Sequence, residues 1–165
     1  MSGGTQQPWW RGSRGEWYVA AQMVLIVVIF FGPRALPGLP AWPAALARPT
    51  TWLGAALMFA GAALLLASAL KLGSGLTPLP YPVANATLAR TGAYGLVRHP
   101  MYAGGVLLAY GWAGVAHGTL TLLYATILLV FFDIKSRREE RWLEERFVDY
   151  PDYRRRVRKL IPFIY

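Results

Sequence analysis

Residues 51–70 form a run of twenty residues without a single charged side chain. At ~1.5 Å per residue, a helix of that length covers roughly 30 Å, which is the thickness of the hydrocarbon core of a bilayer. Irregular backbone cannot face lipid, because its amides would lack partners. The run therefore predicts a membrane-spanning helix, in which Gly54 and Gly61 allow a neighbouring helix to approach closely.

Three further apolar segments set the expected fold class. Gln22 is the one strongly polar residue of the first run, Pro100 suits the first turn of a helix, and His117-Gly118 predicts a tight hairpin. We expect an all-α integral membrane protein, built as a single domain over residues 1–165. Its approximately four transmembrane helices are expected at 17–32, 51–70, 100–116 and 118–134.

Composition supports this class and excludes others. The chain is 55% hydrophobic and 15% charged, whereas soluble domains carry about a quarter charged residues. It has no cysteine and two histidines, so disulfides and thiolate chemistry are excluded and no metal site is predicted.

The segments between and after the apolar runs are polar or rich in proline. Residues 33–49 are predicted to be a loop, with Thr50 or Thr51 capping the next helix. Whether residues 35–47 form an extra helix is left open. The connector 71–98 must lie at the surface or line a pocket. Residues 135–149 predict a charged helix that Pro151 breaks, followed by a short helix at 152–160, and we expect this tail to form a lid.

The basic residues are distributed unevenly. The net charge is +9, and ten of the seventeen Lys and Arg residues follow Asp133. In the four-helix topology, fifteen lie on one side of the membrane and two, Arg34 and Arg48, on the other. The excess marks the cytosolic side, which then holds both termini and the sequence motifs described next. Such a tail indicates contact with membrane lipids, and no nucleic-acid partner is expected.

Two short motifs carry candidate chemistry. Arg98-His99-Pro100-Met101-Tyr102 joins a cation and an imidazole to a helix N-terminus, where free amides and a guanidinium favour a carboxylate. Glu139-Glu140 offers carboxylates for an amino group or ribose hydroxyls. Each motif also has a plain structural interpretation, as interfacial anchors and as a solvated helix face with i,i+4 ion pairs.

The order and spacing of these motifs resemble the isoprenylcysteine carboxyl methyltransferase and phospholipid methyltransferase superfamily, in a bacterial-type form. The match covers about residues 77–162. It includes the stretch Gly92–Gly104, the Glu139-Glu140-Arg141-Trp142-Leu143 stretch, and the Phe-x-x-Tyr-x-x-Tyr pattern that begins at Phe147. Two positions depart from the family: Ala93 stands where Pro is frequent, and Val148 where Gly is frequent.

The resemblance implies a site for S-adenosylmethionine, with S-adenosylhomocysteine as the product, in the half of the chain from about residue 77 to 162. The residues it implies around the cofactor are Tyr94, Leu96, Arg98, His99, Pro100, Tyr102, Glu139 and Glu140. The candidate catalytic residues are Arg98, His99, Glu140 and Arg146, the last as a group that orients an anionic substrate.

The resemblance implies methyl transfer to a lipophilic, membrane-accessible acceptor, with a carboxylate of the isoprenylcysteine type as the first choice. A carboxylate needs no general base, whereas an amine or thiol would need one, with His99 or a glutamate as the candidate. N- or S-methylation of a phospholipid amine or small thiol is the alternative. A transporter that uses Glu16, or a membrane scaffold, is a further alternative. The sequence leaves the oligomeric state open.

Overall fold

The computed structural model describes residues 15–76 and 87–165. The predictions for residues 1–14, including the side of the membrane assigned to Arg11 and Arg14, and for the middle of the connector at 77–86, lie outside the described residues. Within the described ranges, the chain forms α-helices and no strand. The elements are α1 (Glu16–Phe31), α2 (Ala44–Leu72), the 3-10 turn η2 (Gly73–Gly75), α3 (Ala93–Leu96), α4 (Pro100–Ala116), α5 (Thr119–Arg146) and α6 (Tyr150–Arg156).

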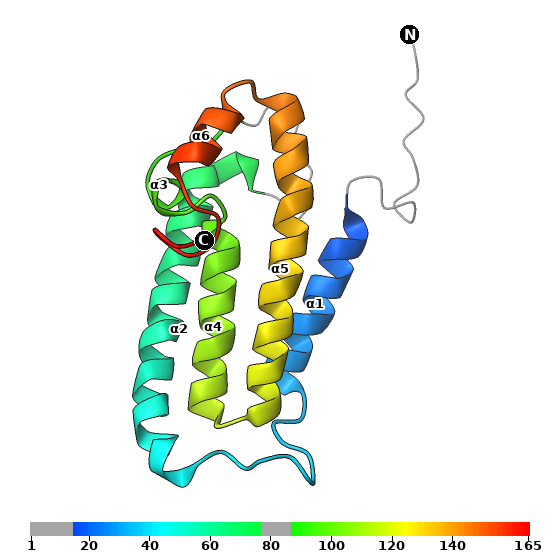
Figure 1. Ribbon diagram of the computed structural model, residues 1–165, viewed down its shortest axis with the longest axis vertical. Helices are drawn as coiled ribbons and strands as arrows, with labels where there is room; N and C mark the ends of the chain where they lie inside the picture. The colour runs from blue at the N-terminus through cyan, green and yellow to red at the C-terminus, as the bar shows by residue number, and fades with distance from the viewer. Residues whose placement is uncertain (1–14, 77–86) are drawn as a thin grey trace.

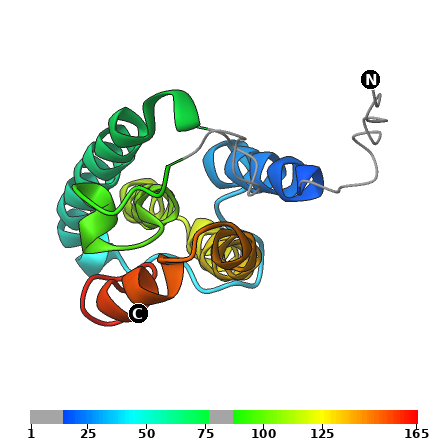
Figure 2. The same cartoon turned by 90° about the horizontal axis from the view of Figure 1, so that it is seen from above.

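Four long helices lie side by side, with the α4–α5 hairpin at the centre (Figure 1). α2 packs along α4, and α1 packs along α5. Seen from above, α1 and α2 stand apart from each other (Figure 2). α5 extends beyond the start of α4, and α6 folds back over that end of the bundle (Figure 1). One end of the bundle therefore gathers the start of α4, the charged end of α5 and the tail.

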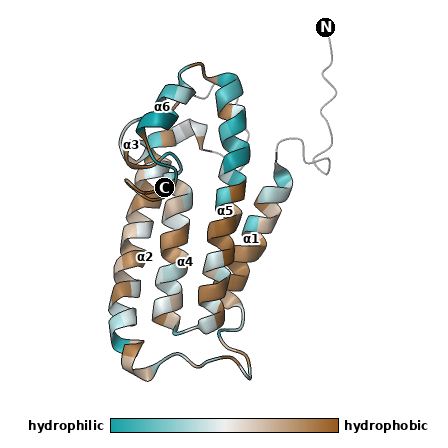
Figure 3. Cartoon of the chain, in the orientation of Figure 1, coloured by the Kyte–Doolittle hydropathy of each residue, from teal (hydrophilic) through white to brown (hydrophobic). Residues whose placement is uncertain are grey.

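Two of these helices, α2 with 29 residues and α5 with 28, are long and apolar enough to cross a membrane. α1 has 16 residues and α4 has 17, which is near the lower limit of length for a span. Large apolar side chains point outward from the bundle, including Phe31, Trp52 and Phe59, which are 85%, 74% and 79% exposed. Figure 3 shows that hydrophilic residues collect on α6 and on the half of α5 that lies next to it. This distribution suits a bundle with an apolar belt and one wet end.

The prediction for the start of the second helix was wrong. α2 begins at Ala44, directly after Pro43, and so continues through Pro49 instead of starting at a Thr50 or Thr51 cap. The segment from Ala44 onward is alanine-rich and favours helix. The Thr50 and Thr51 hydroxyls donate back to the carbonyls of Leu46 and Ala47, at 2.7 and 2.9 Å, as threonines inside a helix do. No separate helix forms between residues 32 and 43.

The division between span and tail was also wrong. α5 runs without a break from Thr119 to Arg146, because residues 134–146 contain neither glycine nor proline and are mostly strong helix formers. Pro151 does not end this helix; it lies in the first turn of α6, where a missing amide costs nothing. α6 covers Tyr150–Arg156 rather than 152–160, so the folded-back segment begins only after Arg146.

Other boundaries are confirmed. α4 covers the predicted 100–116, and His117 adopts the left-handed conformation, with φ 50°, that closes the hairpin to α5. The expected close approach at Gly54 and Gly61 is confirmed as well. A Cβ on Gly54 would lie 2.5 Å from the carbonyl oxygen of Gly111, and one on Gly61 would lie 2.7 Å from that of Gly104. Backbone therefore packs against backbone along the α2–α4 contact.

We expect Gly61→Leu to lower the free energy of unfolding by roughly 1–3 kcal/mol, because the added side chain would overlap the backbone of α4. Thermal unfolding in detergent measures the effect. Ala60→Leu is the matched control, since Ala60 is the preceding residue of the same helix and is exposed. Equal melting temperatures for the two variants would contradict the tight α2–α4 packing.

Candidate active site

The segment before α4 is held by the tail of the chain. After α3, Val97 is extended and forms a parallel bridge with Arg158. The amides of Arg98 and His99 donate to the carbonyls of Arg158 and Lys159, at 2.7 and 3.1 Å. These bonds fix the backbone from which the Arg98 and His99 side chains extend.

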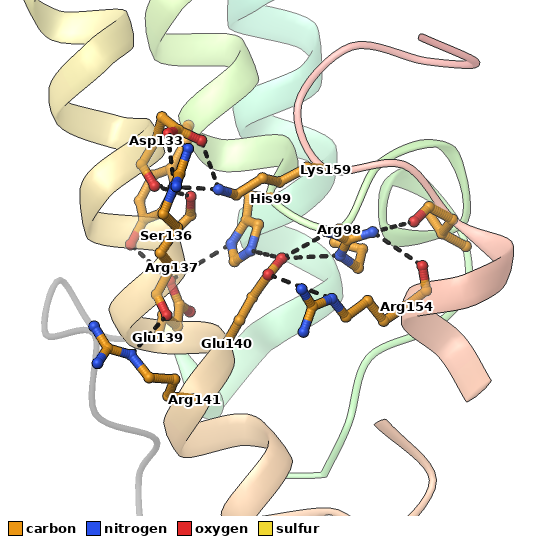
Figure 4. Close-up of polar contacts among 12 residues, drawn as sticks. Arg98, His99, Asp133, Ser136, Arg137, Glu139, Glu140, Arg141, Arg154 and Lys159 are labelled. Atoms are coloured by element: carbon orange, nitrogen blue, oxygen red, sulfur yellow. Dashed lines mark hydrogen bonds and ion pairs between the residues drawn. The ribbon is translucent and has the colours of Figure 1, made fainter. Parts of the chain in front are cut away.

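Both side chains are directed to one carboxylate, that of Glu140 on α5 (Figure 4). Nε and Nη2 of Arg98 each lie 2.9 Å from Oε1 of Glu140, and Nε2 of His99 lies 3.1 Å from the same oxygen. His99 and Glu140 are each 5% exposed. A buried charge is tolerated only when it is paired and hydrogen-bonded, so each member of this cluster depends on the others.

The remaining donors of Arg98 hold the tail. Nη1 donates to the carbonyl of Arg154 at 3.1 Å and to that of Val157. Nε of Arg154 in turn lies 3.9 Å from Oε2 of Glu140. The sequence predicts that Arg98 presents its donors to a cofactor carboxylate. In the structure, those donors are directed to Glu140 and to two carbonyls of the tail.

The second carboxylate, Glu139, is placed by an aromatic stack. The Tyr102 hydroxyl donates to Oε2 of Glu139 at 2.8 Å, and Nδ1 of His99 lies 3.6 Å from the same oxygen. The Tyr102 ring is stacked between His99 and Phe132, with centroids 5.4 and 4.7 Å away. Unlike Glu140, Glu139 keeps a quarter of its side chain exposed, so this carboxylate is available to a ligand.

The charge state of His99 follows from this setting. Burial alone would lower the pKa of the imidazole, but hydrogen bonds and charge interactions with Glu139 and Glu140 outweigh it and raise the pKa above its ordinary value. His99 is therefore stabilised as a cation that donates from its ring nitrogens. In that state it cannot accept a proton as a general base.

A cavity of about 520 Å³ opens beside these groups. Its wall is polar toward α6 and apolar toward the middle of the bundle. The polar lining includes Gln22, Tyr94, Arg98, His99, Tyr102, Lys135, Glu139, Tyr150 and Tyr153. The apolar lining includes Ile26, Ile29, Phe30, Leu65, Leu108, Ala109, Leu128 and Phe132. The cavity thus joins α1, α2, α4, α5 and α6 and offers room for a polar and an apolar moiety together.

Most of the predicted site residues meet here. Tyr94, Arg98, His99, Pro100, Tyr102 and Glu139 line the cavity, and Glu140 supports Arg98 and His99 from α5. Two predicted residues are placed elsewhere among the described residues: Leu96 is 56% exposed, and the Arg146 guanidinium lies 5.8 Å from the centre of the Phe147 ring. Their functional roles remain predictions.

Three lining residues were missed as site residues, namely Lys135, Tyr150 and Tyr153. The Tyr153 hydroxyl donates to the carbonyl of Tyr94 at 2.6 Å, whereas the hydroxyl of Tyr150 is buried and finds no hydrogen-bond partner in the described part of the chain. Burial raises the pKa of Tyr153 to about 12. Burial also raises the pKa of Tyr150, so both phenols stay protonated. The three-residue spacing of Phe147, Tyr150 and Tyr153 was the available signal, since it places them on one face of a helical turn.

Fold and site together define a helical protein of membrane type, with a charged cluster beside a cavity that has a polar and an apolar wall. The family model described as phospholipid methyltransferase matches residues 49–149, which is more than half of the chain. The chain belongs to the phospholipid methyltransferase family. This family lies within the superfamily of isoprenylcysteine carboxyl methyltransferase-like membrane methyltransferases, so the resemblance seen in the sequence is confirmed. Membership identifies the chain as a methyltransferase and hence an enzyme.

The raised pKa of His99 predicts a pH dependence. Charged and titratable groups that face it are Glu139 and Glu140 on α5, Tyr102 on α4, and Arg98. A raised pKa contributes stability that is fully present below the unfolded value of about 6.5 and is lost as pH rises through the folded pKa. Melting temperature should therefore fall more steeply above pH of about 6.5 in the wild type than in His99→Gln. Parallel curves for the two proteins would contradict this assignment.

Proposed function

We propose that this protein transfers a methyl group from S-adenosylmethionine to a carboxylate of a lipophilic acceptor, as one domain whose residues 77–162 hold the cofactor. The observation that carries the proposal is the single cavity with a charged wall at Glu139 and an apolar wall at Phe132. A hydrophilic cofactor and a lipophilic acceptor need opposite surroundings. The cavity supplies both surroundings, because Glu139 of the charged wall and Phe132 of the apolar wall lie less than two turns apart on α5.

The residues present fit the cofactor. Glu139 offers carboxylate oxygens for an amino group or ribose hydroxyls. The Tyr150 hydroxyl, which has no hydrogen-bond partner among the described residues, offers a donor or an acceptor. Tyr94 and Phe147 offer ring surfaces for a nucleobase. S-adenosylmethionine supplies an electrophilic methyl group on a cationic sulfur. The chain's part is to hold the reactants in line and to exclude water.

The chemistry of His99 favours a carboxylate as the acceptor. An amine or thiol must lose a proton, and His99 is stabilised in its charged form by Glu139 and Glu140. A carboxylate already carries the negative charge that attacks the methyl group, so no proton has to move. His99 and Arg98 then act by positioning the two glutamates, with Arg98 also holding the tail.

The arrangement also supports entry of the acceptor from the bilayer. The apolar lining comes from α1 and α2, which stand apart, and from the α4–α5 hairpin that lies between them. With four spans, α1, α2, α4 and the first half of α5, the charged end of the bundle carries the basic tail. The positive-inside rule then places this end and both termini in the cytosol, where the cofactor is available.

Methylation of a phospholipid amine is the second candidate, and the family description favours it. Glu139 would then be the candidate base. Base treatment of the labelled lipid product separates the two, because a methyl ester is cleaved and an N-methyl group or thioether is not. The hypotheses of a transporter and of a membrane scaffold lose their support, because the chain belongs to a family of methyltransferases.

We expect the purified protein to bind S-adenosylhomocysteine, and Glu139→Gln to weaken binding by roughly 1–3 kcal/mol, or about fivefold to 150-fold, through loss of one charged contact. Calorimetry or ligand-induced thermal stabilisation measures this. Glu139 is a cleaner choice than Glu140, whose loss would leave Arg98 and His99 buried without their carboxylate.

Glu145→Gln is the matched control, since Glu145 is exposed on the same helix. It should bind like the wild type. Undetectable binding by the wild-type protein at about millimolar S-adenosylhomocysteine would count decisively against the proposed function.

Tyr150→Phe removes only the hydroxyl, which has no hydrogen-bond partner in residues 15–76 and 87–165. We expect it to weaken S-adenosylhomocysteine binding by about 1 kcal/mol, or roughly fivefold, while leaving the unliganded protein at least as stable, because a buried hydroxyl without a partner costs free energy. Tyr153→Phe should show the opposite pattern: it should lower the stability of the unliganded protein more than the affinity for S-adenosylhomocysteine, because the Tyr153 hydroxyl donates to the carbonyl of Tyr94. Melting temperatures with and without the ligand give both quantities. Unchanged affinity in Tyr150→Phe would exclude this hydroxyl from the cofactor site.

A further inference from the structure

Residues 160–165, called the tail loop below, form a compact turn that the proposed function does not use. Leu160 is buried, whereas Phe163 and Ile164 are 89% and 75% exposed. Phe163 also has a φ of 64°, in the left-handed region that bulky side chains rarely adopt. The backbone therefore holds a large aromatic ring outward in a conformation that costs free energy.

The backbone of the tail loop is hydrogen-bonded within the loop itself. The amides of Leu160 and Ile161 each donate to the carbonyl of Tyr165 at 2.7 Å. The amides of Ile164 and Tyr165 donate to the carbonyl of Ile161, at 3.2 and 3.0 Å. Pro162 has no amide to satisfy. Because unpaired amides are costly outside water, this backbone suits a region of low water content.

Two contacts fix the height of the tail loop along the bundle. Oδ1 of Asp133 accepts from the Tyr165 hydroxyl at 2.7 Å and from Nζ of Lys159 at 2.6 Å, the latter visible in Figure 4. Residues 119–132 of α5 carry no charge, so Asp133 is the first charged residue of that helix. The tail loop is thus tied to the point where the apolar part of α5 ends. In a helix that crosses a membrane, this point lies at the interface between hydrocarbon and water.

Basic side chains flank the tail loop at this height. Arg158 is exposed just before the loop, and the side chain of Arg137, 65% exposed, pairs with Asp133. Together with Lys159, they place three cations against the single carboxylate of Asp133. Exposed apolar side chains beside an excess of positive charge are typical of segments that settle on an anionic bilayer surface.

We propose that the tail loop docks on the anionic surface of the bilayer that the bundle spans. Phe163 and Ile164 insert at the interface, and Arg137 and Arg158 face the lipid head groups. The chain thus returns to the membrane after leaving it at the end of the α5 span. The inference goes beyond the proposed function and does not depend on the identity of the cofactor or the acceptor.

Docking would also support the candidate active site. The tail loop directly follows Arg158 and Lys159, whose carbonyls accept from the amides of Arg98 and His99. A lipid contact at the loop therefore holds the segment that fixes the start of α4.

The chain has no cysteine, so a single nitroxide label can be placed at will. Full-length Phe163→Cys is labelled in nanodiscs of phosphatidylcholine and phosphatidylglycerol, and its access to oxygen is compared with its access to a water-soluble nickel chelate. Val148→Cys is the matched control. Val148 is 95% exposed, but it follows the end of α5 at Arg146, thirteen residues or ~20 Å beyond Asp133.

We expect the label at 163 to be more accessible to oxygen than to nickel, and the label at 148 to show the reverse order. Removing phosphatidylglycerol should shift the label at 163 toward nickel access. Ile164→Cys gives the same measurement if Phe163→Cys does not fold.

Three results would overturn the inference. Nickel access at 163 equal to that at 148 would place the tail loop in water. Low access to both reagents would show that protein covers the loop, either a second copy or another partner. Equal access in neutral and anionic bilayers would remove the anionic surface as the partner. Binding of S-adenosylhomocysteine, which tests the proposed function, is measured separately and decides none of these results.

Discussion

The buried carboxylate of Glu140 is the contact on which the rest of the site depends. It accepts from Arg98 and His99 at the start of α4, and Arg98 in turn binds carbonyls of the tail. One glutamate thereby joins α5, α4 and the tail. Removing one partner of such a cluster leaves buried charge uncompensated, at a cost of about 3–5 kcal/mol. The cluster therefore fixes the geometry of the cavity, and not only its charge.

The neighbouring residues Glu139 and Glu140 have different roles in this arrangement. Glu140 is enclosed by cations and serves the structure, while Glu139 keeps part of its carboxylate open to the cavity. His99 touches both glutamates, and their charges favour its protonated form. The result is a polar wall whose charges are set in advance. Such preorganisation lets a site hold reactants without reorganising during the reaction.

Much of the fold was predictable because its determinants are local. The uncharged run at 51–70, Pro100 at a helix start and the His117-Gly118 hairpin each depend on a few adjacent residues. The errors came where local signals compete. Pro49 looked like an end to the loop, yet the alanines before it extend α2 to Ala44. Asp133 looked like the end of a span, yet nothing there interrupts the helix, and α5 continues to Arg146.

The sequence by itself determined the class of the protein: apolar helices, one basic end, and two motifs whose order and spacing match membrane methyltransferases. It could do so because hydropathy, charge distribution and motif spacing depend only on the order of residues along the chain. Only the tertiary structure decided that Arg98 holds Glu140 and the tail, and that Lys135 meets Gln22. It also decided that the Tyr150 hydroxyl is buried without a hydrogen-bond partner in the part of the chain that the structure describes. The physical reason is distance in sequence. Gln22 and Lys135 lie on the first and the fifth helix, and only the packing of α1 against α5 brings their side chains into one cavity.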